Sequence, residues 1–142
     1  MKKYVYIGVL LGIVSSISGC SASGKAFTKF KTPTKDKGLV YVYRPELFTG
    51  TVVHYSVYNK ETDKPVGVLY NKSYFSKSLP VGKYTLKTAT NEIDITIDKN
   101  KIVCLKSYIN MVSMVTYYTK FELEKIPLNI CEKEIIGLNE SI

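Results

Sequence analysis

Apolar and polar residues alternate with a period of two over most of the chain from Gly38 onward. Valine alternates with tyrosine up to Arg44, and isoleucine alternates with aspartate or threonine from Ile93 to Asp98. Strict alternation is typical of strands with one buried face. The pattern predicts strands at 39–44, 53–58, 66–70, 74–79, 84–88, 93–97, 102–108 and 112–121.

Short strands separated by frequent turns are typical of antiparallel two-sheet folds. The segment Asp98-Lys99-Asn100-Lys101 predicts a hairpin turn. We therefore expect a mainly β chain: an antiparallel β-sandwich, immunoglobulin-like or similar, with a short C-terminal helix.

That helix is predicted because the period changes near the C-terminus. Leu128, Cys131, Ile135 and Leu138 fall on one face of a helix, with Asn129 as a candidate N-cap. We expect the helix to close one face or edge of the sheet. The alternative is a helix that binds a partner.

The first 20 residues follow a different pattern. Lys2 and Lys3 precede an apolar run that ends near Val14, and small residues lead to Cys20. The run is shorter than the ~18 residues that indicate a spanning helix, and its order is typical of a cleaved export segment. An ordinary secretory signal with a coincidental cysteine is one reading of this segment.

The other reading is lipidation, because Ile17-Ser18-Gly19-Cys20 resembles the lipobox of bacterial lipoproteins. The resemblance implies a signal peptide at residues 1–19 and acyl chains such as palmitate on Cys20, the first mature residue. It also implies a lipid-anchored location in the cell envelope. Because Ser21 and not aspartate follows, the resemblance implies the outer membrane facing the periplasm if the host is Gram-negative.

The mature chain is basic. Without Lys2 and Lys3 it has 18 basic and 12 acidic residues, a net charge of +6 (18 − 12). Residues 20–37 contain five lysines together with serine, threonine, glycine and proline, and Phe27 and Phe30 are their large apolar residues. We expect a lipidated N-terminus and flexible basic linker there, able to lie on anionic headgroups, and a β-sandwich domain at residues 38–142. Because the lysines are scattered along the chain, we expect no nucleic-acid partner.

Two further segments carry a family resemblance. Gly38 to Pro45, with its Tyr-Val-Tyr-Arg-Pro sequence, and Tyr74-Phe75 with Leu79 to Leu86 resemble strands of small bacterial lipoproteins labelled a domain of unknown function. The resemblance implies a lipid-anchored β-sandwich and carries no catalytic residues.

Candidate chemistry is sparse. His54 is the only histidine, and we interpret it as a surface residue more readily than as a base or ligand. We expect no metal site and no cofactor, since metal sites draw three or four ligands from several such side chains. Cys104 and Cys131 remain once Cys20 is lipidated. In an oxidising compartment they form either a disulfide or two buried thiols.

Arg44 is the only arginine. It is expected either to pair with a carboxylate, such as that of Glu46 or Glu122, or to recognise an anionic ligand. The 12 tyrosines either cover half-buried sheet faces or supply stacking platforms for a glycan. The glycan reading uses Tyr41, Tyr43, Tyr55, Tyr58, Tyr70, Tyr74, Tyr108, Tyr117 and Tyr118.

Together these features predict a membrane-anchored envelope lipoprotein that is not an enzyme. It would be a structural or interaction module, with the membrane and envelope proteins as partners. The alternative function is a small binding module for cell-wall glycan or another envelope ligand.

Overall fold

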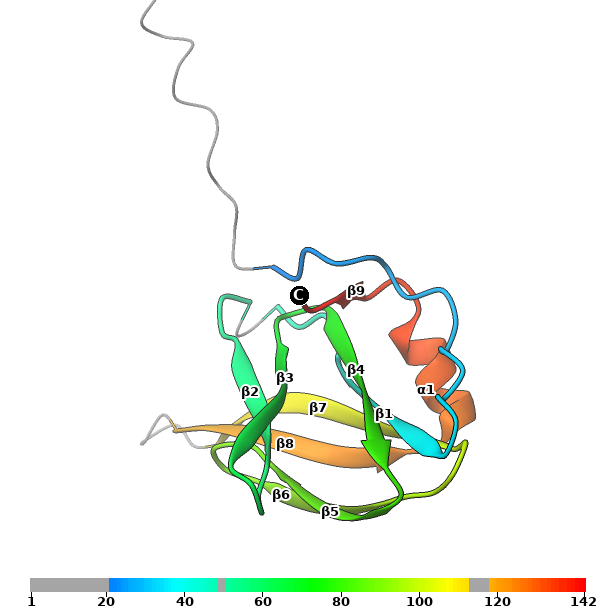
Figure 1. The fold of residues 1–142 in the computed structure, drawn as a ribbon. Coiled ribbons are helices and arrows are strands. Elements are labelled where there is room, and N and C mark those ends of the chain that lie inside the picture. The colour runs from blue at the N-terminus through cyan, green and yellow to red at the C-terminus, as the bar shows by residue number, and fades with distance from the viewer. Residues whose placement is uncertain (1–20, 49–50, 113–117) are drawn as a thin grey trace, which may run out of the picture.

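The computed structural model describes residues 21–48, 51–112 and 118–142 (Figure 1). Mainly β structure with one short C-terminal helix confirms the predicted fold class. The elements are β1 Lys37–Arg44, β2 Tyr55–Asn59, β3 Lys64–Leu69, β4 Ser73–Pro80, β5 Gly82–Lys87, β6 Glu92–Ile97, β7 Ile102–Val112, β8 Tyr118–Ile126, α1 Leu128–Ile135 and β9 Asn139–Glu140.

Two sheets form the sandwich. The five-stranded sheet has the order β8-β7-β1-β4-β9, and the four-stranded sheet has the order β3-β2-β5-β6. Most neighbours are antiparallel, but β1 pairs with β7 and β4 with β9 in parallel. Parallel neighbours need a crossover connection. Here the chain between β1 and β7 forms the four strands of the other sheet and also β4.

The main core lies between the sheets. Val40 and Val42 of β1 point into it and meet Val57, Leu86 and Ile95 of the four-stranded sheet. Each of these side chains is at most 3% exposed, and burying one contributes about 1.5–3 kcal/mol relative to leaving it exposed. The alternation read from the sequence thus sets which face of each strand packs inward.

A second apolar cluster covers the other face of the five-stranded sheet. Tyr41 and Tyr43, which alternate with the valines of β1, belong to it and are 0% exposed. Cys131 and Ile135 of α1 cover part of this face, and Phe27 from the N-terminal segment covers another part. β1 is therefore buried on both of its faces.

The N-terminal segment differs from the flexible linker predicted for residues 20–37. Phe27 is only 4% exposed, with its ring 5.4 Å from that of Tyr74. Its backbone amide donates to the carbonyl of Leu138 at 2.8 Å, and Ala26 forms an antiparallel bridge with Asn139. Burial of an aromatic side chain together with backbone pairing offsets the entropy of ordering the segment. Residues 21–37 therefore belong to the domain.

The C-terminal helix lies against the five-stranded sheet. Cys131 and Ile135 are buried on its inner face, and Leu138, just beyond its end, is also buried. Leu128 is 40% exposed, and Pro127 takes the N-cap position that was predicted for Asn129. These contacts support the closing role and not the partner-binding one.

One turn and one strand differ from the sequence-based expectation. The turn at residues 98–101 joins β6 of one sheet to β7 of the other, so it is not a hairpin turn. Asn100 in it has a φ of 59°, a conformation that asparagine tolerates well. The strand predicted at 112–121 includes residues 113–117, which lie outside the described residues, and β8 runs on to Ile126.

Candidate functional site

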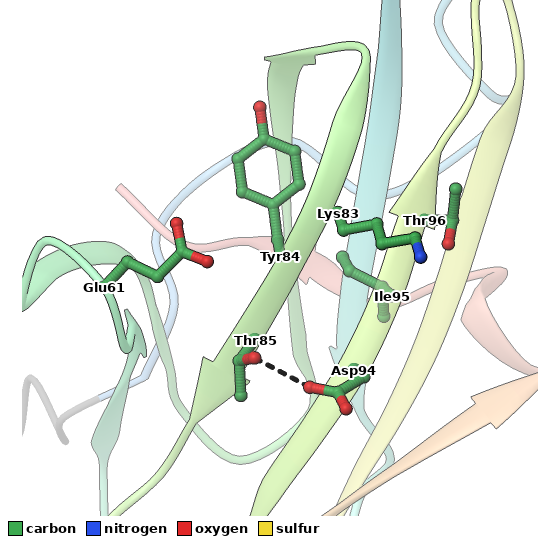
Figure 2. Close-up of a pocket in the computed structure, with 7 residues that line it drawn as sticks. All are labelled: Glu61, Lys83, Tyr84, Thr85, Asp94, Ile95 and Thr96. Atoms are coloured by element: carbon green, nitrogen blue, oxygen red, sulfur yellow. Dashed lines mark hydrogen bonds between the residues drawn. The ribbon is translucent and has the colours of Figure 1, made fainter.

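The outer face of the four-stranded sheet carries a shallow hollow of about 380 Å³, here called the β5–β6 hollow (Figure 2). Lys83 and Thr85 alternate outward from β5, and Asp94 and Thr96 do the same from β6. Glu61 reaches it from the turn between β2 and β3. The lining is completed by Tyr84 and Ile95.

Within the β5–β6 hollow, the hydroxyl of Thr85 donates to Oδ1 of Asp94 at 2.7 Å (Figure 2). This bond joins two neighbouring strands, because Thr85 and Asp94 are directly opposite in the β5–β6 register. The lining of the hollow includes a hydroxyl group, a carboxylate and an ammonium group. Such groups can bind a polar ligand by hydrogen bonds.

A second hollow of about 450 Å³ lies on the same sheet and includes Ser56, Tyr58, Asp63 and Lys87. The ammonium group of Lys87 contacts Oδ1 of Asp63 at 2.8 Å. Hydrogen bonding to that carboxylate raises the pKa of Lys87. The two charged residues of this second hollow are thus paired with each other, one from β5 and one from the turn between β2 and β3.

Arg44 is 0% exposed at the end of β1. Its Nη1 donates to the carbonyl of Val53 at 2.5 Å, and its guanidinium carbon lies 5.5 Å from the centre of the Tyr55 ring. Burial lowers the pKa of Arg44, while interaction with Tyr55 opposes that shift. These contacts support a structural role and not recognition of an anionic ligand.

The expected carboxylate partners of Arg44 lie elsewhere. Within the part of the chain that the structure describes, no ion pair joins Arg44 to Glu46 or Glu122. Glu46 instead contacts the ammonium group of Lys72 at 3.1 Å. The contacts of Arg44 with a backbone carbonyl and an aromatic ring do not involve either predicted carboxylate.

His54 is exposed and stacks on Tyr70, with 5.4 Å between the ring centres. It lines neither hollow described above. Across residues 21–48, 51–112 and 118–142, no group of three or more histidine, cysteine, aspartate or glutamate side chains is placed to hold a metal ion.

Cys104 of β7 and Cys131 of α1 are joined in a disulfide, with Cα atoms 6.4 Å apart. Both side chains are at most 2% exposed. The bond fastens the helix to the outer face of the five-stranded sheet. Of the two alternatives left open by the sequence, the structure contains the disulfide.

A polar network that sequence reasoning missed lies beside the disulfide. The hydroxyl of Tyr43 donates to Oε2 of Glu134 at 2.6 Å, and Nζ of Lys106 contacts the same oxygen at 2.7 Å. Lys106 and then Tyr43 lower the pKa of Glu134, whereas burial and then this carboxylate raise the pKa of Tyr43. The residues come from a helix and two strands, so no local spacing pointed to them.

The tyrosines do not gather into one stacking platform among the described side chains. Tyr41, Tyr43, Tyr55 and Tyr74 are all at most 9% exposed and belong to the two cores. Tyr58 lines the second hollow and Tyr70 stacks on His54. The side chains of Tyr117 and Tyr118 lie outside the described part. The tyrosines of β1 are thus core residues, and the glycan platform built on them and Arg44 is not formed.

Cys20, the predicted lipidation site, also lies outside the described residues, but its covalent neighbour Ser21 is placed. The described chain begins at the end of the sandwich where β9 and the connection between β1 and β2 also lie (Figure 1). Close by, the amide of Gly24 bonds to the carbonyl of Glu140 at 2.9 Å. In the described part of the chain, no helix is long and apolar enough to cross a membrane.

Neither a family model nor a curated protein nor a solved structure matches this chain. The resemblance to small bacterial lipoproteins therefore stays a prediction, and so does the lipidation of Cys20.

Proposed function

We propose that this chain is an envelope lipoprotein that acts as a non-enzymatic interaction module, held at the membrane by acyl chains on Cys20. The observation that carries the proposal is the close attachment of the segment that follows Cys20. A lipid on Cys20 would be joined to the sandwich through residues 21–27, which are paired to the C-terminal segment by backbone hydrogen bonds. Such an anchor would hold the domain against the bilayer without a long tether.

The lipobox-like sequence supports the anchor independently of the fold. Ile17-Ser18-Gly19 precedes Cys20, and a basic and apolar export pattern precedes them. Two or more acyl chains give stable membrane attachment, whereas a single chain gives only marginal binding.

Growth of a bacterial host with an alkyne analogue of palmitate tests the anchor. We expect the wild-type chain to incorporate the label, and the C20A variant to incorporate none. S23A is the matched control, because Ser23 is a small exposed residue in the same segment. Equal labelling of C20A and wild type would contradict acylation at Cys20.

The role as an interaction module has its own test. Crosslinking in intact cells, followed by mass spectrometry, is expected to capture the same envelope proteins reproducibly with the wild-type chain. Failure to capture any protein above the level of an unrelated lipoprotein would contradict this role.

The second candidate function is a small binding module for cell-wall glycan or another polar envelope ligand. The β5–β6 hollow favours it, because 380 Å³ falls within the usual range of small-molecule sites. Titration with soluble cell-wall fragments should shift the NMR signals of Thr85, Asp94 and Thr96 and leave Val81 unchanged. Identical titration curves for wild type and the D94A variant would contradict binding at this hollow.

A further inference from the structure

Two large apolar side chains project from the connection between β1 and β2. Phe48 is 99% exposed and Val52 is 80% exposed. Single exposed apolar residues are common, but these two lie on the same connection, four positions apart. Figure 1 shows this connection at the same end of the sandwich as the start of the described chain.

The described part of this loop is held in place. The amide of Leu47 donates to the side-chain oxygen of Asn71 at 2.9 Å, and the hydroxyl of Thr51 donates to the carbonyl of Phe48 at 2.7 Å. Glu46 forms an ion pair with Lys72, with 3.1 Å between Oε2 and Nζ. The residues that flank the apolar side chains of this loop are therefore held by hydrogen bonds and an ion pair.

Lys72, which contacts this loop through Glu46, is also connected to the segment that follows Cys20. The carbonyl of Lys72 accepts a hydrogen bond from Asn139 at 3.2 Å. The next residue, Glu140, bonds to Gly24 at 2.9 Å and, through its own amide, to the carbonyl of Lys25 at 2.9 Å. A short series of bonds thus joins the loop of Phe48 to the residues beside the proposed anchor.

We propose that Phe48 and Val52 insert into the membrane surface beside the acyl chains of Cys20, so that the domain stands on the bilayer in one orientation. This inference rests on the proposed function. The bilayer is the occupant because the described chain begins, directly after Cys20, at the same end of the sandwich as the connection between β1 and β2 that carries these residues (Figure 1). The exposed Lys25 adds electrostatic attraction to anionic headgroups. Apolar side chains that insert into a membrane surface lie at the boundary between the headgroups and the acyl chains.

The chain contains no tryptophan, so a single introduced indole reports its own surroundings. The F48W variant of the full chain is produced in its lipidated form and reconstituted into vesicles of phosphatidylethanolamine and phosphatidylglycerol. We expect its emission to shift to shorter wavelength relative to the detergent-free C20A form of the same variant. We also expect brominated lipids to quench most of it.

V81W is the matched control. Val81 is 54% exposed in the turn between β4 and β5, which Figure 1 places at the opposite end of the sandwich. The emission wavelength of this tryptophan should stay at the value typical of an indole in water, and brominated lipids should not quench it. Equal quenching of the two variants, or none at F48W, would overturn the inference. Intact mass of each sample is measured in parallel, so that absence of acyl chains counts against the proposed function and not against the orientation.

Discussion

The backbone amide of Gly24 donates a hydrogen bond of 2.9 Å to the carbonyl of Glu140 and so joins the N-terminal segment to the C-terminal strand. The amide of Phe27 repeats this connection to Leu138 at 2.8 Å. Residues close to the predicted lipidation site are therefore structural members of the sandwich.

Replacing Phe27 with alanine should destabilise the domain. The ring is 4% exposed and lies 5.1 Å from Phe30 and 6.0 Å from Tyr41, between ring centres. Phenylalanine-to-alanine changes in cores cost about 3–5 kcal/mol. Urea unfolding measures this loss. F48A is the control: Phe48 is 99% exposed, so its loss should stay within about 0.5 kcal/mol. Equal stability of F27A and F48A would mean that the segment does not pack in solution.

The disulfide between Cys104 and Cys131 should stabilise the fold. It closes a loop with a sequence separation of 27, for which the chain-entropy relation gives about 3.5 kcal/mol. The C104A/C131A double variant should unfold at lower urea concentration than the wild type, and addition of a reductant should narrow the difference. Alkylation of both thiols in denatured, non-reduced protein would contradict the pairing.

Glu134 should make stability depend on pH in the acid range. Its pKa is lowered in the folded state from the ordinary value of 4.5, first by Lys106 and then by Tyr43. The stabilisation is therefore present above pH 4.5 and lost as the pH falls through the lower folded pKa. Because the side chain is partly exposed, we expect it to contribute only about 1 kcal/mol.

The free energy of unfolding of E134Q, measured across this pH range, tests the contribution of the Glu134 carboxylate to stability. The variant should be less stable than the wild type at neutral pH, and the two should converge as the solution is acidified. E132Q, changed at an exposed position of the same helix, serves as the control. A constant difference between E134Q and wild type over the whole range would contradict the assignment.

Replacing Arg44 with lysine should cost about 1–3 kcal/mol, the range for a buried group that loses its hydrogen-bond partner. Lysine keeps the charge but cannot reproduce the planar guanidinium that contacts both Val53 and Tyr55. Thermal unfolding of R44K measures the effect. R44K with unchanged stability would rule out the structural role.

Local alternation was enough to predict much of the fold. The Val-Tyr pattern of β1 and the isoleucines of β6 each predicted a strand correctly, because burial of one face imposes a period of two. The helical spacing of Cys131 and Ile135 likewise predicted α1.

Relationships between distant segments were not predictable in the same way. The parallel pairing of β1 with β7 depends on which strands become neighbours in the five-stranded sheet, although they lie far apart in the sequence. The packing of Phe27 depends on a cluster assembled from β1, β4 and α1. In the sequence, Phe27 and Phe30 stand among lysine, threonine and serine, so their surroundings favoured a linker. The partners of Glu134 lie 91 and 28 positions away, beyond any local pattern.

The central claim is that Cys20 carries lipid and that the domain is held at the membrane through it. Intact mass spectrometry of the full-length gene product, extracted from host membranes, tests this most directly. The account predicts the mass of residues 20–142 with one disulfide and two or more acyl chains at the N-terminal cysteine. An unmodified chain, or one cleaved at another position, would contradict it.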